Sequence, residues 1–135
     1  MNGFKAVIDT NIIFMSLYNP EGKAGKIIKY AAENKLILFA TDSVKQELST
    51  ILKRELSHND SEVKLIIDSL PITWIEKEIY QPALEKTKVK HKPDKPTEAL
   101  SLILNCGILS ADTDFNNIKN KIDVNKLLDE LKQVT

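Results

Sequence analysis

The sequence predicts an α/β fold with a mostly parallel β-sheet, and two observations lead to this prediction. Short, mostly apolar runs such as Phe4–Ile8 are typical of strands covered on both faces. Longer segments with apolar residues at helical spacing separate these runs along the chain. Strands that alternate with helices are typical of a parallel sheet with helical crossovers.

Four segments are expected to be strands. Each is short and apolar, and each is followed by polar residues. In chain order they are Phe4–Ile8, Leu36–Ala40, Ile72–Ile75 and the run "GILS" at 107–110.

Helical spacing of apolar residues predicts the segments between and after the strands. Ser43 and Gln46 fit a capping box at the start of one helix. Pro96 suits the first turn of another, which we expect to end at Gly107. The predicted helices cover 22–34, 43–56, 61–69, about 83–89, 96–106 and 124–134.

Length and charge favour an ordinary globular protein. A chain of 135 residues is long enough for one domain with a substantial core, so a single domain over 1–135 is expected. Nineteen basic residues balance nineteen acidic ones. This balance argues against nucleic-acid binding through bulk positive charge, but it leaves room for a local basic patch.

The cysteine and histidine content predicts the cellular compartment and excludes one type of metal site. Cys106 is the only cysteine, so an internal disulfide is excluded and a reducing, cytoplasmic location is expected. With only His58 and His91 beside it, a zinc site of the Cys/His type cannot be assembled. No apolar stretch approaches the roughly 20 residues that a membrane span needs, and no signal peptide is evident.

Acidic residues follow the predicted strands. Asp9 ends the first strand, and Asp112 and Asp114 follow the last one. Glu47 comes one helical turn after the second strand, at a spacing that places it on the apolar face of its helix, and Asp94 precedes the helix that opens at Pro96. Because ligands of open parallel sheets bind at the carboxyl ends of the strands, these acids are expected to converge on one edge.

Each acid also has a purely structural interpretation. Asp9 would suit a turn, and Glu47 would suit the positive end of a helix dipole. Asp94 and Asp112 would suit helix N-caps. Several carboxylates at one edge would nevertheless repel one another unless a cation neutralised them, and an all-oxygen set favours Mg²⁺ or Mn²⁺.

Four motifs together resemble those of the PIN domain nucleases. They are "VIDTN" at 7–11, Glu47, "PDKPTEALSL" at 93–102 and "GILSADTDF" at 107–115, and the resemblance runs from about Phe4 to Phe115. It implies a three-layer α/β/α fold and a divalent-metal-dependent endoribonuclease with one or two Mg²⁺ or Mn²⁺ ions.

The resemblance also implies roles for individual residues. The acids Asp9, Glu47, Asp94 and Asp112 would be catalytic metal ligands, with Asp114 as an accessory ligand. Asn11 and Ser110 would orient the carboxylates, although Ser110 stands where threonine is more usual in the family. Glu98 is an extra acid that the resemblance does not explain.

A run of basic residues leads into Asp94. Lys90, Lys92 and Lys95 are candidates for contacting RNA phosphates near the acidic edge. Many small members of this family are toxins held inactive by an antitoxin, so a cognate antitoxin is an expected partner besides RNA. The sequence is compatible with either a monomer or a homodimer.

Other functions deserve comparison. A haloacid dehalogenase phosphatase would need an aspartate where Asn11 stands, and a receiver domain would need a different pattern after its last strand. The main alternative is a catalytically inactive PIN-like module that binds RNA or a protein partner.

Overall fold

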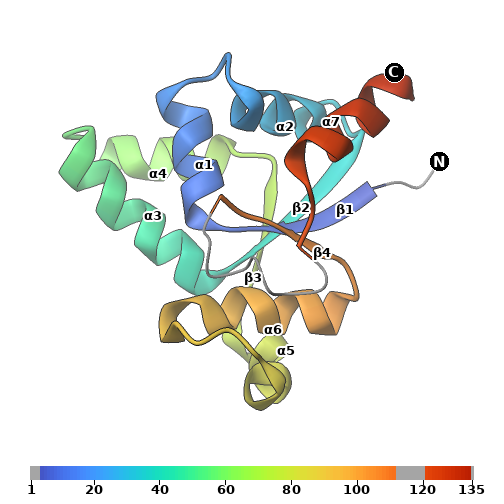
Figure 1. Cartoon of the computed structure of the whole chain (residues 1–135). Helices are drawn as coiled ribbons and strands as arrows, with labels where there is room; N and C mark the ends of the chain where they lie inside the picture. Colours follow the sequence, from blue (N-terminus) through green and yellow to red (C-terminus); the bar gives the residue numbers. More distant parts are fainter. Residues whose placement is uncertain (1–3, 112–120, 135) are drawn as a thin grey trace.

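A four-stranded parallel sheet forms the centre of the computed structural model, which describes residues 4–111 and 121–134. Helices cover both faces of this sheet (Figure 1), so the predicted three-layer α/β/α fold with a mostly parallel sheet is confirmed. The strands lie in the order β3-β2-β1-β4, and every neighbouring pair is parallel. Their bounds are β1 (Phe4–Ile8), β2 (Leu36–Thr41), β3 (Ile72–Ile75) and β4 (Gly107–Leu109).

The helices divide between the two faces of the sheet. In Figure 1, α5 and α6 lie on one side, and α1 to α4 with α7 lie on the other. Two short 3₁₀ helices, η1 (Gln81–Lys86) and η2 (Lys92–Asp94), connect α5 to α6. The α-helices are α1 (Thr10–Tyr18), α2 (Lys23–Ala32), α3 (Asp42–Glu55), α4 (Asp60–Ser69), α5 (Lys77–Tyr80), α6 (Lys95–Leu104) and α7 (Val124–Gln133).

The core reflects the alternation of side chains along β1. Ala6 and Ile8 pack into the larger apolar cluster under α1 to α4 and α7. Val7 points to the other face and packs with Tyr80 and Leu100 from α5 and α6. All three β1 residues are fully buried, which is why this strand reads as a continuous apolar run rather than an alternating one.

The helix starts and ends differ from the sequence prediction at several points. The capping box at Ser43 and Gln46 is wrong, because α3 begins at Asp42 and the hydroxyl of Thr41 accepts the cap hydrogen bond from the Val44 amide at 3.1 Å. A complete capping box is found instead at the start of α4, between Asn59 and Glu62.

Three further segments differ from the sequence prediction. Helix α6 ends at Leu104 because Asn105 adopts a left-handed conformation with φ of 52°, and Gly107 is already the first residue of β4. The helix expected over 83–89 is a 3₁₀ helix that ends at Lys86. Helix α1 was not predicted, because its mostly apolar sequence continues the run that begins in β1.

The strand order places a topological switch point at the end of β1. From β1 the chain moves outward to β2 and β3, then returns through α5 and α6 to place β4 on the other side of β1. Open α/β sheets bind ligands at such a point, outside the carboxyl ends of the strands. Asp9, directly after β1, therefore lies where a ligand site is expected.

In the part of the chain that the structure describes, every helix is too short or too polar to span a membrane.

Candidate active site

Asp9 lies at the switch point between β1 and β4. Its backbone amide donates to the carbonyl of Leu109 at 3.2 Å, which continues the β1–β4 pairing past the strand end. Its carboxylate is only 7% exposed and accepts a hydrogen bond from the Ile12 amide at 3.2 Å, so Asp9 is the N-cap of α1. The hydroxyl of Ser110 donates to the second carboxylate oxygen.

Asp9 therefore has a capping role and a fixed orientation at the same time. Ser110, which was expected inside the last strand, directly follows β4, and its hydroxyl holds one carboxylate oxygen across a separation of 101 residues in the chain. Holding a buried carboxylate by both oxygens restricts its rotation, which is the support that a metal ligand requires.

Glu47 reaches the same region from α3. The prediction that it lies on the apolar face is wrong, because Val44 and Leu48 are buried while Glu47 is exposed. Its carboxylate is nevertheless directed toward α1, where it accepts a hydrogen bond from the hydroxyl of Thr10.

Thr10 is a site residue that the sequence analysis missed. It is buried, and its hydroxyl orients Glu47, whereas the side chain of Asn11 is exposed and makes no hydrogen bond to any described residue. Both residues line a cavity at the carboxyl end of β1, which we call the acidic cavity because Asp9, Glu47 and Asp94 also line it. In the sequence, the sign of this role was that Thr10, a hydroxyl residue, directly follows the aspartate at the end of a buried strand.

Asp94 ends η2 and occupies the N-cap position of α6. Its side chain makes no capping hydrogen bond, so the purely structural interpretation of Asp94 as an N-cap does not describe it. One carboxylate oxygen lies 3.1 Å from Nδ1 of His91, and the side chain is 16% exposed.

These three acids line one cavity of about 80 Å³ at the carboxyl end of β1. They arrive there from the end of β1, from α3 and from η2. The lining residues are Asp9, Thr10, Asn11, Val44, Glu47, His91, Pro93, Asp94 and Thr97.

The acidic cavity contains the donor type expected for a hard divalent cation. Its carboxylates offer oxygen ligands, as Mg²⁺ and Mn²⁺ prefer, and no thiol lines it. Within residues 4–111 and 121–134, however, no three acidic, histidine or cysteine side chains lie close enough together to hold an ion. Asp112 and Asp114, the remaining predicted ligands, lie outside the described residues.

Glu98, which sequence reasoning left unassigned, has a structural role. It is 3% exposed, and its carboxylate accepts hydrogen bonds from the amides of Lys88 at 2.7 Å and Val89 at 2.9 Å. It does not line the acidic cavity. Glu98 thus fixes the segment that connects η1 to η2.

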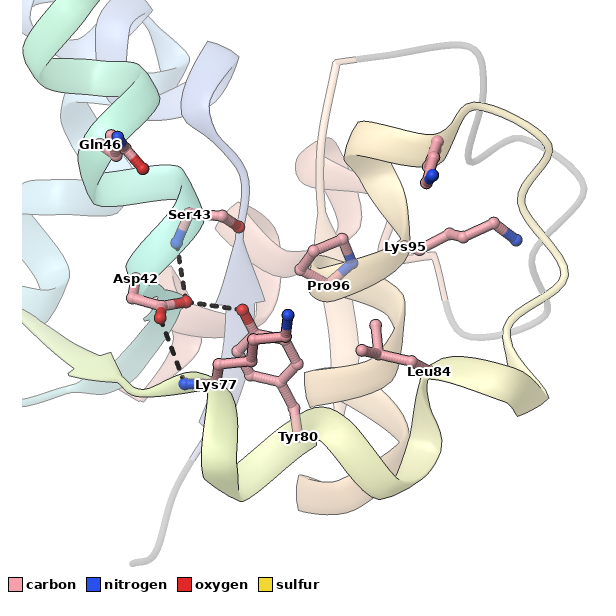
Figure 2. Close-up of a pocket in the computed structure, with 9 residues that line it drawn as sticks. Asp42, Ser43, Gln46, Lys77, Tyr80, Leu84, Lys95 and Pro96 are labelled. Carbon is pink, nitrogen blue, oxygen red and sulfur yellow. Dashed lines mark hydrogen bonds between the residues drawn. The ribbon is translucent and has the colours of Figure 1, made fainter.

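The three lysines proposed from sequence lie in different environments. Lys90 is exposed and lines none of the described cavities. Lys95 is half-buried, and its ammonium group donates to the carbonyl of Val89 at 3.1 Å. Lys92 and Lys95 both line a second, larger cavity, which is drawn in Figure 2 with Lys95 labelled.

Comparisons with known proteins agree with this architecture. A family model described as "PIN domain" matches residues 7–131, so the match extends beyond Phe115 and through most of α7. No curated protein matches the chain.

Two solved structures show the same fold. VapBC2 from Rickettsia felis, bound to a DNA fragment from its promoter, superposes with a TM-score of 0.61 at 14% identity, covering 88% of this chain and 96% of that one. PAE2754 from Pyrobaculum aerophilum superposes with a TM-score of 0.62 at 16% identity, covering 96% and 90%. With a family match over residues 7–131 and this shared fold, the chain belongs to the PIN domain family.

Proposed function

We propose that this chain is a single-domain, divalent-metal-dependent endoribonuclease that hydrolyses RNA phosphodiester bonds. One observation supports this most strongly: Asp9, Glu47 and Asp94, far apart in the chain, line one cavity at the switch point of a PIN fold. Asp112 and Asp114, which follow β4, are proposed to complete the set of ligands.

Some residues of the acidic cavity would bind the metal, and others would orient the side chains that bind it. Asp9, Glu47 and Asp94 would supply carboxylate oxygens, while Ser110 and Thr10 keep two of these carboxylates oriented. A bound Mg²⁺ or Mn²⁺ would supply a water of lowered pKa and neutralise charge on the departing oxygen. His91, beside Asp94, would restrict the motion of that carboxylate.

The role of toxin in a toxin–antitoxin pair is the biological setting that we propose. A solved neighbour of the same fold is a VapBC2 assembly, and the acidic cavity offers a basic segment of an antitoxin an opposite charge to bind. Arrested growth on overproduction of the wild-type chain, relieved in Asp9→Asn, is the expected result. Normal growth at a verified level of active protein would contradict the toxin role.

The nuclease is tested by incubating the purified chain with single-stranded RNA in the presence of Mn²⁺ or EDTA. Cleavage is expected only with Mn²⁺, and it should be lost in Asp9→Asn. Asp68→Asn is a matched control, because Asp68 lies exposed on α4 and pairs only with Lys64 there. Cleavage that survives in Asp9→Asn would overturn the assignment of the acidic cavity.

The second candidate is a catalytically inactive module that binds RNA or a protein. The observation that favours it is that no three acidic, histidine or cysteine side chains among the described residues form a group that could hold a metal ion. RNA binding without cleavage at any Mn²⁺ concentration, together with no Mn²⁺ density between Asp9, Glu47 and Asp94 in a soaked crystal, would decide for the module.

A further inference from the structure

A cavity of about 520 Å³, drawn in Figure 2, is lined by residues next in the chain to those of the acidic cavity. We call it the lysine pocket. It is bounded by the first turns of α3 and α6 and by the segment from α5 to η1. Its lining residues are Asp42, Ser43, Gln46, Lys77, Tyr80, Leu84, Lys92, Lys95 and Pro96.

The lysine pocket and the acidic cavity share two walls. On α3, Gln46 lines the lysine pocket and the next residue, Glu47, lines the acidic cavity. At the start of α6, Asp94 lines the acidic cavity and Lys95 lines the lysine pocket. A polymer bound across the acids would therefore place its adjoining unit at this pocket.

The charge of the lysine pocket favours an anionic ligand. Three lysines and one carboxylate line it. The carboxylate, Asp42, already accepts hydrogen bonds from the hydroxyl of Tyr80 at 2.6 Å and from the amides of Lys77 at 3.2 Å and Ser43 at 2.8 Å (Figure 2). Its charge is thus partly compensated within the wall, whereas the ammonium groups of Lys77 and Lys92 make no hydrogen bond or ion pair with any described residue.

The remaining walls favour a flat, partly apolar group. Tyr80, Leu84 and Pro96 give the pocket an apolar surface, and its volume lies within the range of small-molecule sites. The Tyr80 hydroxyl is committed to Asp42, so the residue is a fixed wall rather than a mobile side chain.

The side chain of Gln46 can form hydrogen bonds with such a ligand. Its side chain is exposed on α3, and the amide makes no hydrogen bond to any described residue. A carboxamide presents a donor and an acceptor side by side, which matches the hydrogen-bonding edge of a nucleobase.

We propose that the lysine pocket binds one unpaired nucleotide of the RNA, adjacent to the phosphate held at the acidic cavity. The base lies against Leu84 and Pro96 with its edge toward Gln46, and the phosphate binds the ammonium groups of Lys77 and Lys92, since that of Lys95 already donates to the Val89 carbonyl. This inference rests on the proposed function for the identity of the ligand and for its neighbour at the acids.

The test uses the full chain in EDTA, titrated separately with AMP, CMP, GMP, UMP and inorganic phosphate and followed by amide NMR shifts. At least one nucleotide is expected to bind more tightly than phosphate and to shift amides of residues 42–46, 77–84 and 92–95. Lys77→Ala should weaken this binding about tenfold, the effect of one charge-assisted hydrogen bond. Lys26→Ala is the matched control, since Lys26 is exposed on α2 on the opposite face of the sheet.

Two further variants separate the base from the phosphate. Leu84→Trp fills the pocket and should abolish nucleotide binding, while Gln46→Ala should reduce the differences in affinity among the four nucleotides. The proposal is overturned if no nucleotide shifts these amides, if phosphate binds as tightly as every nucleotide, or if Lys77→Ala binds like wild type.

The titration does not depend on catalysis, so the two proposals can fail separately. Nucleotide binding in the pocket of a chain that never cleaves RNA would remove only the nuclease. Mn²⁺-dependent cleavage by a chain whose pocket takes no nucleotide would remove only the lysine pocket as a subsite.

Discussion

Two substitutions of Asp9 separate its capping role from its proposed metal role. Asp9→Ala removes the acceptor for the Ile12 amide and the acceptor for the Ser110 hydroxyl. Asp9→Asn removes the negative charge and keeps a side-chain oxygen for the Ile12 amide, and asparagine caps helices about as well as aspartate. The other oxygen becomes an NH2 group, which can donate to the Ser110 hydroxyl oxygen instead of accepting from it.

The expected magnitudes follow from these two contacts. Loss of a helix N-cap costs about 1 kcal/mol, and loss of a buried hydrogen bond costs about as much again, so Asp9→Ala should be destabilised by about 2 kcal/mol. With an unfolding entropy of roughly 2.1 cal/mol/K per residue, this lowers the melting temperature of a 135-residue chain by about 7 °C. Asp9→Asn should lose less than about 1 kcal/mol, or about 3 °C.

Thermal unfolding with and without Mn²⁺ measures both effects. At ten times its dissociation constant, Mn²⁺ should stabilise the wild-type chain by about 1.4 kcal/mol, or about 5 °C, and should leave Asp9→Asn unchanged. If Asp9→Asn melts as low as Asp9→Ala in EDTA, the capping argument is wrong. If Mn²⁺ raises the melting temperature of Asp9→Asn as it does for wild type, Asp9 is not a metal ligand.

Three further predictions concern the scaffold. Glu98→Ala should lower the free energy of unfolding by about 2 kcal/mol or more in chemical denaturation, because two backbone amides lose their acceptor. Glu98→Gln keeps an acceptor oxygen, so it should keep both stability and Mn²⁺ binding. Loss of Mn²⁺ binding in Glu98→Gln would show that Glu98 is a metal ligand instead. Gly25→Ala should cost about 3 kcal/mol, since its Cβ would lie 1.8 Å from the carbonyl oxygen of Pro20. Gly22→Ala should cost less, because its Cβ would lie 3.0 Å from the side-chain nitrogen of Asn19 and 3.4 Å from the Asn19 carbonyl oxygen; equal melting temperatures for the two variants would refute this. Burial, and then the hydrogen bond to Asp42, raise the pKa of the Tyr80 phenol above its ordinary value of 10.0. The folded state therefore retains a proton that the unfolded state loses, so stability falls as pH rises above about 10, and this fall should be shallower in Tyr80→Phe, as urea denaturation at a series of pH values would show.

The sheet was predictable from sequence because its strands are short and mostly apolar, and Ala6, Val7 and Ile8 of β1 are fully buried. Phe4–Ile8 and Ile72–Ile75 stand out as short apolar runs and match the observed strands. Helix α1 was missed for the same reason, since a helix that is apolar on most sides shows no periodicity to distinguish it from the preceding strand.

The candidate site was only partly predictable. Asp9 could be placed because it directly follows a strand, and strand ends meet at one edge. The contact between Thr10 and Glu47 could not, because it depends on how α1 and α3 pack across 37 residues of sequence. The lysine pocket has no local signature either, since its residues come from α3, α5, η1, η2 and α6.

The position of β4 has a consequence for the growing polypeptide. Among the residues that the structure describes, β4 is the last strand of the sheet in chain order, and it brings Ser110 to Asp9 from 101 residues away. A nascent chain that has not yet emerged past Leu109 lacks this partner, so the carboxylate that caps α1 is not yet locked in place. The acidic edge is thus completed late in synthesis, after the segments that carry Glu47 and Asp94 are already available to fold.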